Sequence, residues 1–72
     1  MDIIAFELDP GREFVELNQL LKLVGLVDSG GAGKALVASG SVQVDGATEL
    51  RKTCKIHAGQ VVTIEGMEIR VS

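Results

Sequence analysis

The sequence has 72 residues, which is enough for one domain, and its net charge at pH 7 is −3. Its single cysteine and single histidine exclude an internal disulfide and make a poor metal site, so we expect no metal, no cofactor and a reducing compartment, the cytoplasm. With two phenylalanines and neither tryptophan nor tyrosine, the chain cannot offer the aromatic platforms on which single-stranded bases stack, and no apolar run approaches the roughly 20 residues of a membrane span.

The chain begins with a predicted strand over residues 1–8, where apolar and polar residues alternate weakly. Two acids and no basic start in this stretch do not fit a signal peptide. A turn is predicted at Asp9–Gly11, because Pro and Gly in succession interrupt regular structure. Phe14 and Val15 then predict a short extended segment.

Two helices joined by a short link are predicted next. The apolar stripe of the first helix has the i, i+3, i+4, i+7 spacing of one helix face and consists of Leu17, Leu20, Leu21 and Val24. We expect Asn18 to cap the start of this helix and Gly25 to end it. Ser29 is the expected N-cap of the second helix, which ends at Gly40. Its predicted apolar residues are Ala32, Ala35 and Leu36. The pair predicts a helix–turn–helix hairpin.

After Gly40 the sequence period changes to two, which is typical of strands. Val42 and Val44 precede Asp45–Gly46, a strong signal for a two-residue hairpin. A second turn is predicted at Glu65–Gly66, which places Ile64 opposite Met67. The order of strand, helix, helix and hairpins predicts a single α+β domain over residues 1–72.

The charges of the chain are segregated, which matters more than the net value. Residues 1–17 and 61–72 are net acidic, whereas residues 18–60 hold five of the seven Lys and Arg and three of the ten Asp and Glu. A local basic patch sets the electrostatic field at a site regardless of the total charge. The central segment can therefore attract a polyanion.

The first candidate site is the sequence Ser-Gly-Gly-Ala-Gly-Lys at residues 29–34. It looks like a phosphate-binding P-loop, but Asp28 and Ala35 stand where that motif needs Gly and Ser or Thr, which disfavours nucleotide hydrolysis. Glycines still let the backbone N–H groups of a helix start approach a phosphate, and Lys34 shares a helix face with Gly30. The alternative is that the glycines serve close packing of this helix on a neighbour.

The second candidate site is a cluster of cations, Arg51, Lys52 and Lys55, in a loop between two predicted strands. The alternative is an ordinary solvated loop. Lys22 lies off the apolar stripe of the first helix and can join either site. Cys54 fits a small buried side chain better than a nucleophile. Because no Ser/His/Asp set or spaced carboxylate pair is present, we expect no catalytic residues and no enzyme activity.

In chain order, these pieces resemble the alpha-L RNA-binding motif, the S4 domain of a small-subunit ribosomal protein, and are closest to its stand-alone bacterial members. The linked pattern is Ser-Gly-Gly-x-x-Lys at 29–34, Gly-x-Val-x-Val-x-Gly at 40–46, Arg-Lys at 51–52 and Gly-x-x-Val at 59–62. The resemblance covers about residues 14–62. It is carried by the whole pattern rather than by any single piece.

The resemblance implies an α+β fold in which the helix–turn–helix hairpin packs on a small, bent antiparallel sheet. It also implies binding of structured RNA, chiefly ribosomal RNA. The RNA-binding residues that it implies are Lys22, Ser29, Gly30, Gly31, Lys34, Arg51, Lys52 and Lys55. The sequence departs from the family pattern at three of its positions. Many members have Arg where Gly30 stands, Asn where Asp45 stands and Asp where Gln60 stands.

We therefore expect a cytoplasmic protein that binds RNA through phosphates, with the five cations of this set in one continuous patch. The N–H groups of Gly30 and Gly31 should be open to solvent, and Ser29 should cap the helix. The main alternative is a protein-interaction module of a ribosome-linked complex, with the acidic first strand as a pairing edge. Another is an accessory subunit of an RNA-modifying enzyme. The expected partners are structured RNA and ribosomal or RNA-modifying proteins, and no membrane.

Overall fold

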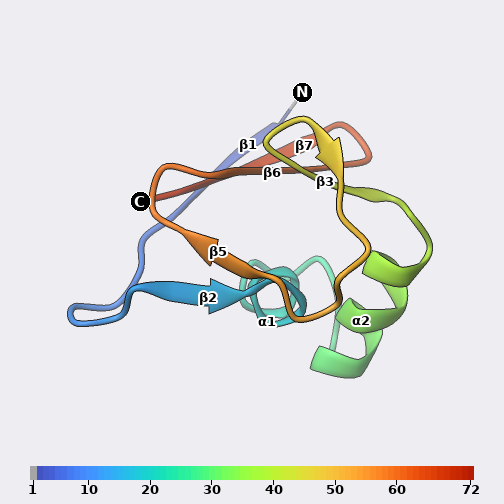
Figure 1. Ribbon diagram of the computed structural model, residues 1–72, viewed down its shortest axis with the longest axis horizontal. Coiled ribbons are helices and arrows are strands. Elements are labelled where there is room, and N and C mark those ends of the chain that lie inside the picture. The colour runs from blue at the N-terminus through green and yellow to red at the C-terminus, as the bar shows by residue number, and fades with distance from the viewer. Residues whose placement is uncertain (1) are drawn as a thin grey trace.

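Two helices lie against seven strands in the computed structural model, which describes residues 2–72 (Figure 1). The elements in chain order are β1 (Asp2–Phe6), β2 (Phe14–Glu16), α1 (Leu17–Leu23), α2 (Gly30–Ala38), β3 (Val42–Val44), β4 (Ala47–Thr48), β5 (Lys55–His57), β6 (Val61–Ile64) and β7 (Met67–Val71). The expected first strand is confirmed over Asp2–Phe6, and Met1 lies outside the described residues. Within residues 2–72, neither helix has the length and apolar character that a membrane crossing needs.

The larger sheet has the strand order β1-β7-β6-β3-β4. Its two tight turns confirm the predicted hairpins: Asp45–Gly46 joins β3 to β4, and Glu65–Gly66 joins β6 to β7. All four turn residues have positive φ, between 45° and 85°, which is the geometry of a hairpin turn that matches the twist of its strands. The second turn puts Ile64 opposite Met67, as predicted.

The edge strand β1 makes the sheet mixed rather than purely antiparallel. It runs parallel to β7, with Ile4 opposite Ile69, whereas β7, β6, β3 and β4 pair antiparallel as expected. Beyond the strand, Ser72 extends the pairing, since its O accepts from Leu8 N at 2.8 Å and its N donates to Phe6 O at 2.9 Å. A parallel pair needs a long crossover, and nearly the whole chain separates these two strands.

A second, two-stranded ribbon pairs β2 with β5 in antiparallel register, which confirms the extended segment at Phe14 and Val15. Val15 and Ile56 face each other and are both buried. The ribbon runs directly into α1 and lies with both helices on the same side of the larger sheet (Figure 1). One core fills the space between these layers. Its fully buried large side chains are Leu17, Leu20, Leu21, Val37, Val42, Ile56, Val62 and Ile69.

The expected helix ends are confirmed, because Gly25 and Gly40 follow the two helices with φ of +84° and +82°. The expected face of α2 is right for Leu36, which is partly buried against the core, and wrong for the two alanines. Ala32 and Ala35 are exposed, and the buried residues of this helix are Gly33 and Val37. Glycine carries no hydrophobic signal, so an apolar pattern could not identify this face.

The expected N-cap of α1 is also wrong. Glu16 occupies the N-cap position, so the helix begins at Leu17, two residues earlier than an Asn18 cap implies, and Asn18 is buried with 2% of its surface exposed. No side chain caps this helix start, because the backbone supplies the acceptors: Leu17 N donates to Cys54 O at 2.8 Å, and Asn18 N donates to Lys52 O at 3.2 Å. Backbone carbonyl groups of the loop before β5 therefore accept the hydrogen bonds that a capping side chain would otherwise accept.

Candidate nucleic-acid interface

The start of α2 has the geometry that the sequence predicts. Ser29 has extended backbone angles, and its Oγ accepts a hydrogen bond from Ala32 N at 3.1 Å. The first helical bond runs from Gly33 N to Ser29 O. The N–H groups of Gly30 and Gly31 precede that bond and lie at the open end of the helix, with Gly31 exposed and Gly30 half-buried. A helix end of this kind attracts an anion.

The glycines of this turn divide between the two roles that the sequence left open. A Cβ on Gly33 would lie 2.5 Å from the backbone O of Asn18, so this glycine serves close packing on α1. A Cβ on Gly31 would meet only Ser29 Oγ, at 3.9 Å, so the absence of a side chain there leaves the surface open. Gly30 is intermediate, since its Cβ would meet Gln19 Nε2 at 2.8 Å.

Asn18 brings the two candidate sites together. Its backbone N donates to Lys52 O in the basic loop at 3.2 Å, and its Nδ2 donates to Gly30 O in the first turn of α2 at 3.4 Å. Its backbone O lies so close to Gly33 that there is no room for a Cβ at that position. Its buried Oδ1 has no hydrogen-bond partner among the described residues. One buried residue thus fixes the helix start and the loop side by side.

Arg51 in the basic loop is held by an acid of the same loop. Glu49 Oε2 accepts from the backbone N and from Nε of Arg51, at 2.9 and 3.0 Å, and Oε1 accepts from Nη2 at 3.0 Å. The side-chain hydrogen bond from Arg51 is the main reason that the pKa of Glu49 falls from 4.5 to about 2. At neutral pH the charge of Arg51 is therefore compensated, although its side chain is 78% exposed.

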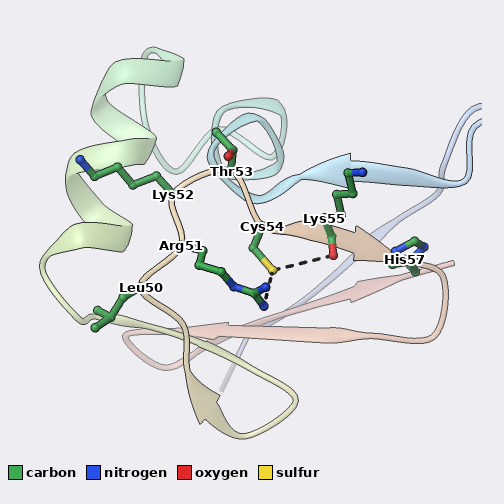
Figure 2. A pocket seen from close by; sticks show the side chains of 7 residues that line it. All are labelled: Leu50, Arg51, Lys52, Thr53, Cys54, Lys55 and His57. Carbon is green, nitrogen blue, oxygen red and sulfur yellow. Dashed lines mark hydrogen bonds between the residues drawn. The ribbon is translucent and has the colours of Figure 1, made fainter.

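Cys54 packs against the same ion pair. Its Sγ lies 3.5 Å from Glu49 Oε1 and 3.6 Å from Arg51 Nη2 (Figure 2 draws the contact with Arg51). Burial, and next the negative charge of Glu49, raises the pKa of the Cys54 thiol. A thiol held protonated is a poor nucleophile, which agrees with the structural role that the sequence favours.

The remaining cations point in different directions. Figure 2 shows Lys52 extending to the α2 side of the loop, whereas Lys55 points the other way, toward β2. The Lys55 ammonium lies 4.9 Å from the centroid of the Phe14 ring. Lys22 and Lys34 are exposed on α1 and α2. The structure thus joins Lys52 to the start of α2 through Asn18 and turns Lys55 toward Phe14, while one continuous patch of all five cations stays a prediction.

The sequence profile of the S4 domain matches residues 6–72. The chain belongs to the S4 domain family. S4 domains are RNA-binding domains rather than enzymes. Two curated relatives support this placement. YbcJ of Escherichia coli K12, provisionally named an RNA-binding protein, is 53% identical over 57 residues, which cover 79% of this chain and 81% of the relative. RlbA of Bacillus subtilis 168, provisionally named a ribosome maturation protein, is 37% identical over 54 residues, 75% of this chain and 76% of the relative.

A solved structure confirms the fold of this S4 domain. The solution structure of Escherichia coli YbcJ, described as carrying an alpha-L motif involved in RNA binding, matches with a TM-score of 0.72 and 45% identity. The match covers 99% of this chain and 89% of YbcJ. The predicted α+β fold and the resemblance to the alpha-L motif are therefore confirmed.

Asp45 and Gln60, two positions at which the resemblance implies other residues, are hydrogen-bonded to each other. Asp45 Oδ2 accepts from Gln60 Nε2 at 3.0 Å, and Asp45 Oδ1 accepts from Val61 N at 2.9 Å. These hydrogen bonds, the one from Val61 first, lower the pKa of Asp45. Gln60 Oε1 also accepts from His57 N at 2.8 Å. Asp45 and Gln60 thus tie the β3–β4 turn to the start of β6.

Proposed function

We propose that this S4 domain is a cytoplasmic protein that binds structured RNA, ribosomal RNA first of all, by holding phosphates at the start of α2 and along the adjoining basic loop. The observation that carries the proposal is the double attachment of Asn18, which places the N–H groups of Gly30 and Gly31 next to the loop of Lys52. The names of the relatives, RNA binding for YbcJ and ribosome maturation for RlbA, point to the same class of ligand.

The proposed binding is electrostatic and depends on shape. Among residues 2–72, the side chains of Lys22, Lys34 and Lys52 form no ion pair, so each can neutralise a phosphate and release counterions. An A-form duplex is recognised through its phosphates and 2′-hydroxyls, which suits a surface made of backbone N–H groups and ammonium groups. Since the chain is net acidic and few of its cations are free, we expect a modest affinity that falls steeply with salt.

The test is a salt titration of wild type and Lys34→Ala on a structured ribosomal RNA fragment. The variant should lower the slope of log K against log salt by about one, because it removes one phosphate contact. The loss should be similar for different RNA sequences, since phosphate carries no base information. Stability should stay within about 0.5 kcal/mol of wild type, as for most exposed substitutions.

Arg70→Ala is the matched control, because Arg70 is an exposed cation on β7 that is paired with Glu68. It should leave the slope unchanged. Equal affinities and slopes for wild type and Lys34→Ala, with both proteins folded, would remove Lys34 from the binding surface.

The alternative function is a protein-interaction module or an accessory subunit of a ribosome-linked or RNA-modifying complex. The position of β1 at the edge of the sheet favours it, since an edge strand can pair with another chain, and Ile3 on this strand is 56% exposed. Under this alternative, Lys34→Ala has no effect, whereas Ile3→Lys at the edge abolishes association with the partner.

A further inference from the structure

The β2–β5 ribbon brings an aromatic ring to the surface beside α1. Phe14 and His57 are paired in register, and their ring centroids are 6.0 Å apart. The ammonium of Lys55 lies 4.9 Å from the centroid of the Phe14 ring. A flexible lysine resting on a ring can leave it when another group offers a better contact, so this face of Phe14 is available to a ligand.

A groove of about 570 Å³ opens along this ring, between the ribbon and α1. Its apolar surface comes from Phe14, Val15 and Leu23, and Leu23 is 60% exposed. Its polar rim supplies two cations and two groups that form hydrogen bonds. These rim residues are Arg12, Lys55, Gln19 and Glu16.

The groove is continuous with both elements of the proposed RNA surface. Lys55 lines this groove and also the hollow beside the basic loop, where Arg51 and Lys52 lie. Gln19 lines the groove as well, and its Nε2 stands 2.8 Å from the place that a Cβ on Gly30 would occupy. A nucleic acid held at the start of α2 and along the loop therefore has this groove next to it.

These groups match the chemistry of a single nucleotide that has left its stack. A base needs a flat apolar face, which Phe14 offers, and hydrogen-bond partners at its edge. The amide of Gln19 can donate and accept, the carboxylate of Glu16 can accept, and Arg12 or Lys55 can neutralise the attached phosphate. The low aromatic content excludes a platform for several bases, but one ring is enough for one base.

We propose that this groove binds one unstacked RNA base, so that the S4 domain recognises a bulge or loop next to the helical segment that it holds by its phosphates. The inference rests on the proposed function and deepens it. Continuity with the phosphate-binding elements, together with the two rim cations, favours an RNA base over a peptide as the occupant.

The test compares two RNAs, a ribosomal RNA duplex with a one-nucleotide bulge and the same duplex fully paired. Wild type should prefer the bulged RNA. Phe14→Leu keeps an apolar side chain but loses the ring, and should bind the bulged RNA about three- to tenfold more weakly while its affinity for the paired RNA is unchanged. Phe6→Leu, the same change at the other phenylalanine, is the matched control and should keep the preference.

Two further measurements do not depend on the folding of Phe14→Leu. The ring protons of Phe14 in wild type should shift upfield in NMR spectra when bulged RNA is added, and not when paired RNA is added. Leu23→Gln, at an exposed position, should also reduce the preference. If wild type binds both RNAs equally and the ring protons do not shift, the groove does not bind a base. A groove that binds a peptide instead would give the same result. The proposed function then stands. Binding of neither RNA overturns both.

Discussion

The two elements proposed to hold phosphate present different groups to it. The first turn of α2 offers backbone N–H groups at Gly30 and Gly31, fixed in place because Gly33 packs against Asn18. The basic loop offers side chains, but Glu49 compensates one of its cations, Arg51, and another, Lys55, rests on a ring. The net positive charge of a loop can thus be lower than its number of cations suggests. A glycine turn carries no charge, yet its backbone N–H groups are open to an anion.

The largest expected effect tests how the turn is held in place. Gly33→Ala puts a Cβ 2.5 Å from the backbone O of Asn18, which cannot move aside as a side chain would. We expect a loss of about 2–3 kcal/mol in the free energy of unfolding, measured with urea, since overpacking at a closed contact costs that much. RNA affinity should fall with it, because the same contact aligns the loop.

Gly31→Ala is the matched control for that variant. A Cβ at this position has free space, and its φ is not in the left-handed region. The variant should be as stable as wild type or more stable by up to about 1 kcal/mol, because alanine is the better helix former. Equal effects of the two substitutions would contradict the division of roles between these glycines.

The second prediction adds a positively charged side chain to the first turn of α2. Gly30→Arg places a cation where the resemblance to the alpha-L motif implies one in many members, and its Cβ displaces only the flexible end of Gln19. We expect RNA binding at moderate salt to become about tenfold tighter and the salt slope to steepen by about one. Gly30→Ala displaces Gln19 without adding charge and should leave the slope unchanged. An unchanged slope for Gly30→Arg would place Gly30 outside the phosphate path.

The third prediction concerns Arg51, whose charge the Glu49 carboxylate compensates. Glu49→Gln removes the carboxylate that compensates Arg51, so RNA affinity should rise a few-fold and the salt slope should steepen. Glu68→Gln, which releases Arg70 from the second ion pair, is the control and should change neither quantity.

The same variant has a readout that does not involve RNA. Because Glu49 contributes to the raised pKa of the Cys54 thiol, Glu49→Gln should make the thiol react faster with iodoacetamide at pH 8. An unchanged rate would mean that the carboxylate does not contact the thiol in solution.

The smallest expected effect concerns pH. The pKa of Glu49 is about 2 in the folded protein against an ordinary value of 4.5, so its contribution to stability is complete above pH 4.5 and is lost as the pH falls toward 2. The difference in unfolding free energy between wild type and Glu49→Gln should therefore be constant from pH 8 to 5 and then shrink. It should be small throughout, because exposed ion pairs stabilise weakly. A difference that shrinks already near pH 6 would contradict the assignment.

The features predicted correctly from the sequence are those that depend on neighbouring residues. Asp45–Gly46 and Glu65–Gly66 determine their own turns, and Ser29 caps a helix through a residue three positions on. The stripe beginning at Leu17 is correct because a helix face follows from spacing alone. These local signals also give the order of elements, and hence most of the fold.

Most of the errors arise where a residue finds its partner far along the chain. Asn18 looks like a cap, but distant residues of the loop and of α2 surround it, so it is buried. The parallel pairing of β1 depends on β7, at the other end of the sequence. Glu49 and Arg51 are close in sequence, yet only the folded loop shows that they neutralise each other. For the candidate site, the sequence therefore predicts which groups take part but does not show which of them already have a partner in the fold.

The parallel pairing of β1 with β7 also orders the events of synthesis. The ribosome makes β1 first, yet the strand has no partner until residues 67–71 have been made. Until then Ile4 and Phe6, which pack against the core in the finished fold, remain uncovered. β1 therefore joins the sheet last, and an apolar strand without a partner can pair with other chains during translation. The acids at Asp2 and Glu7, on either side of the apolar residues, can reduce that risk by repelling a second copy.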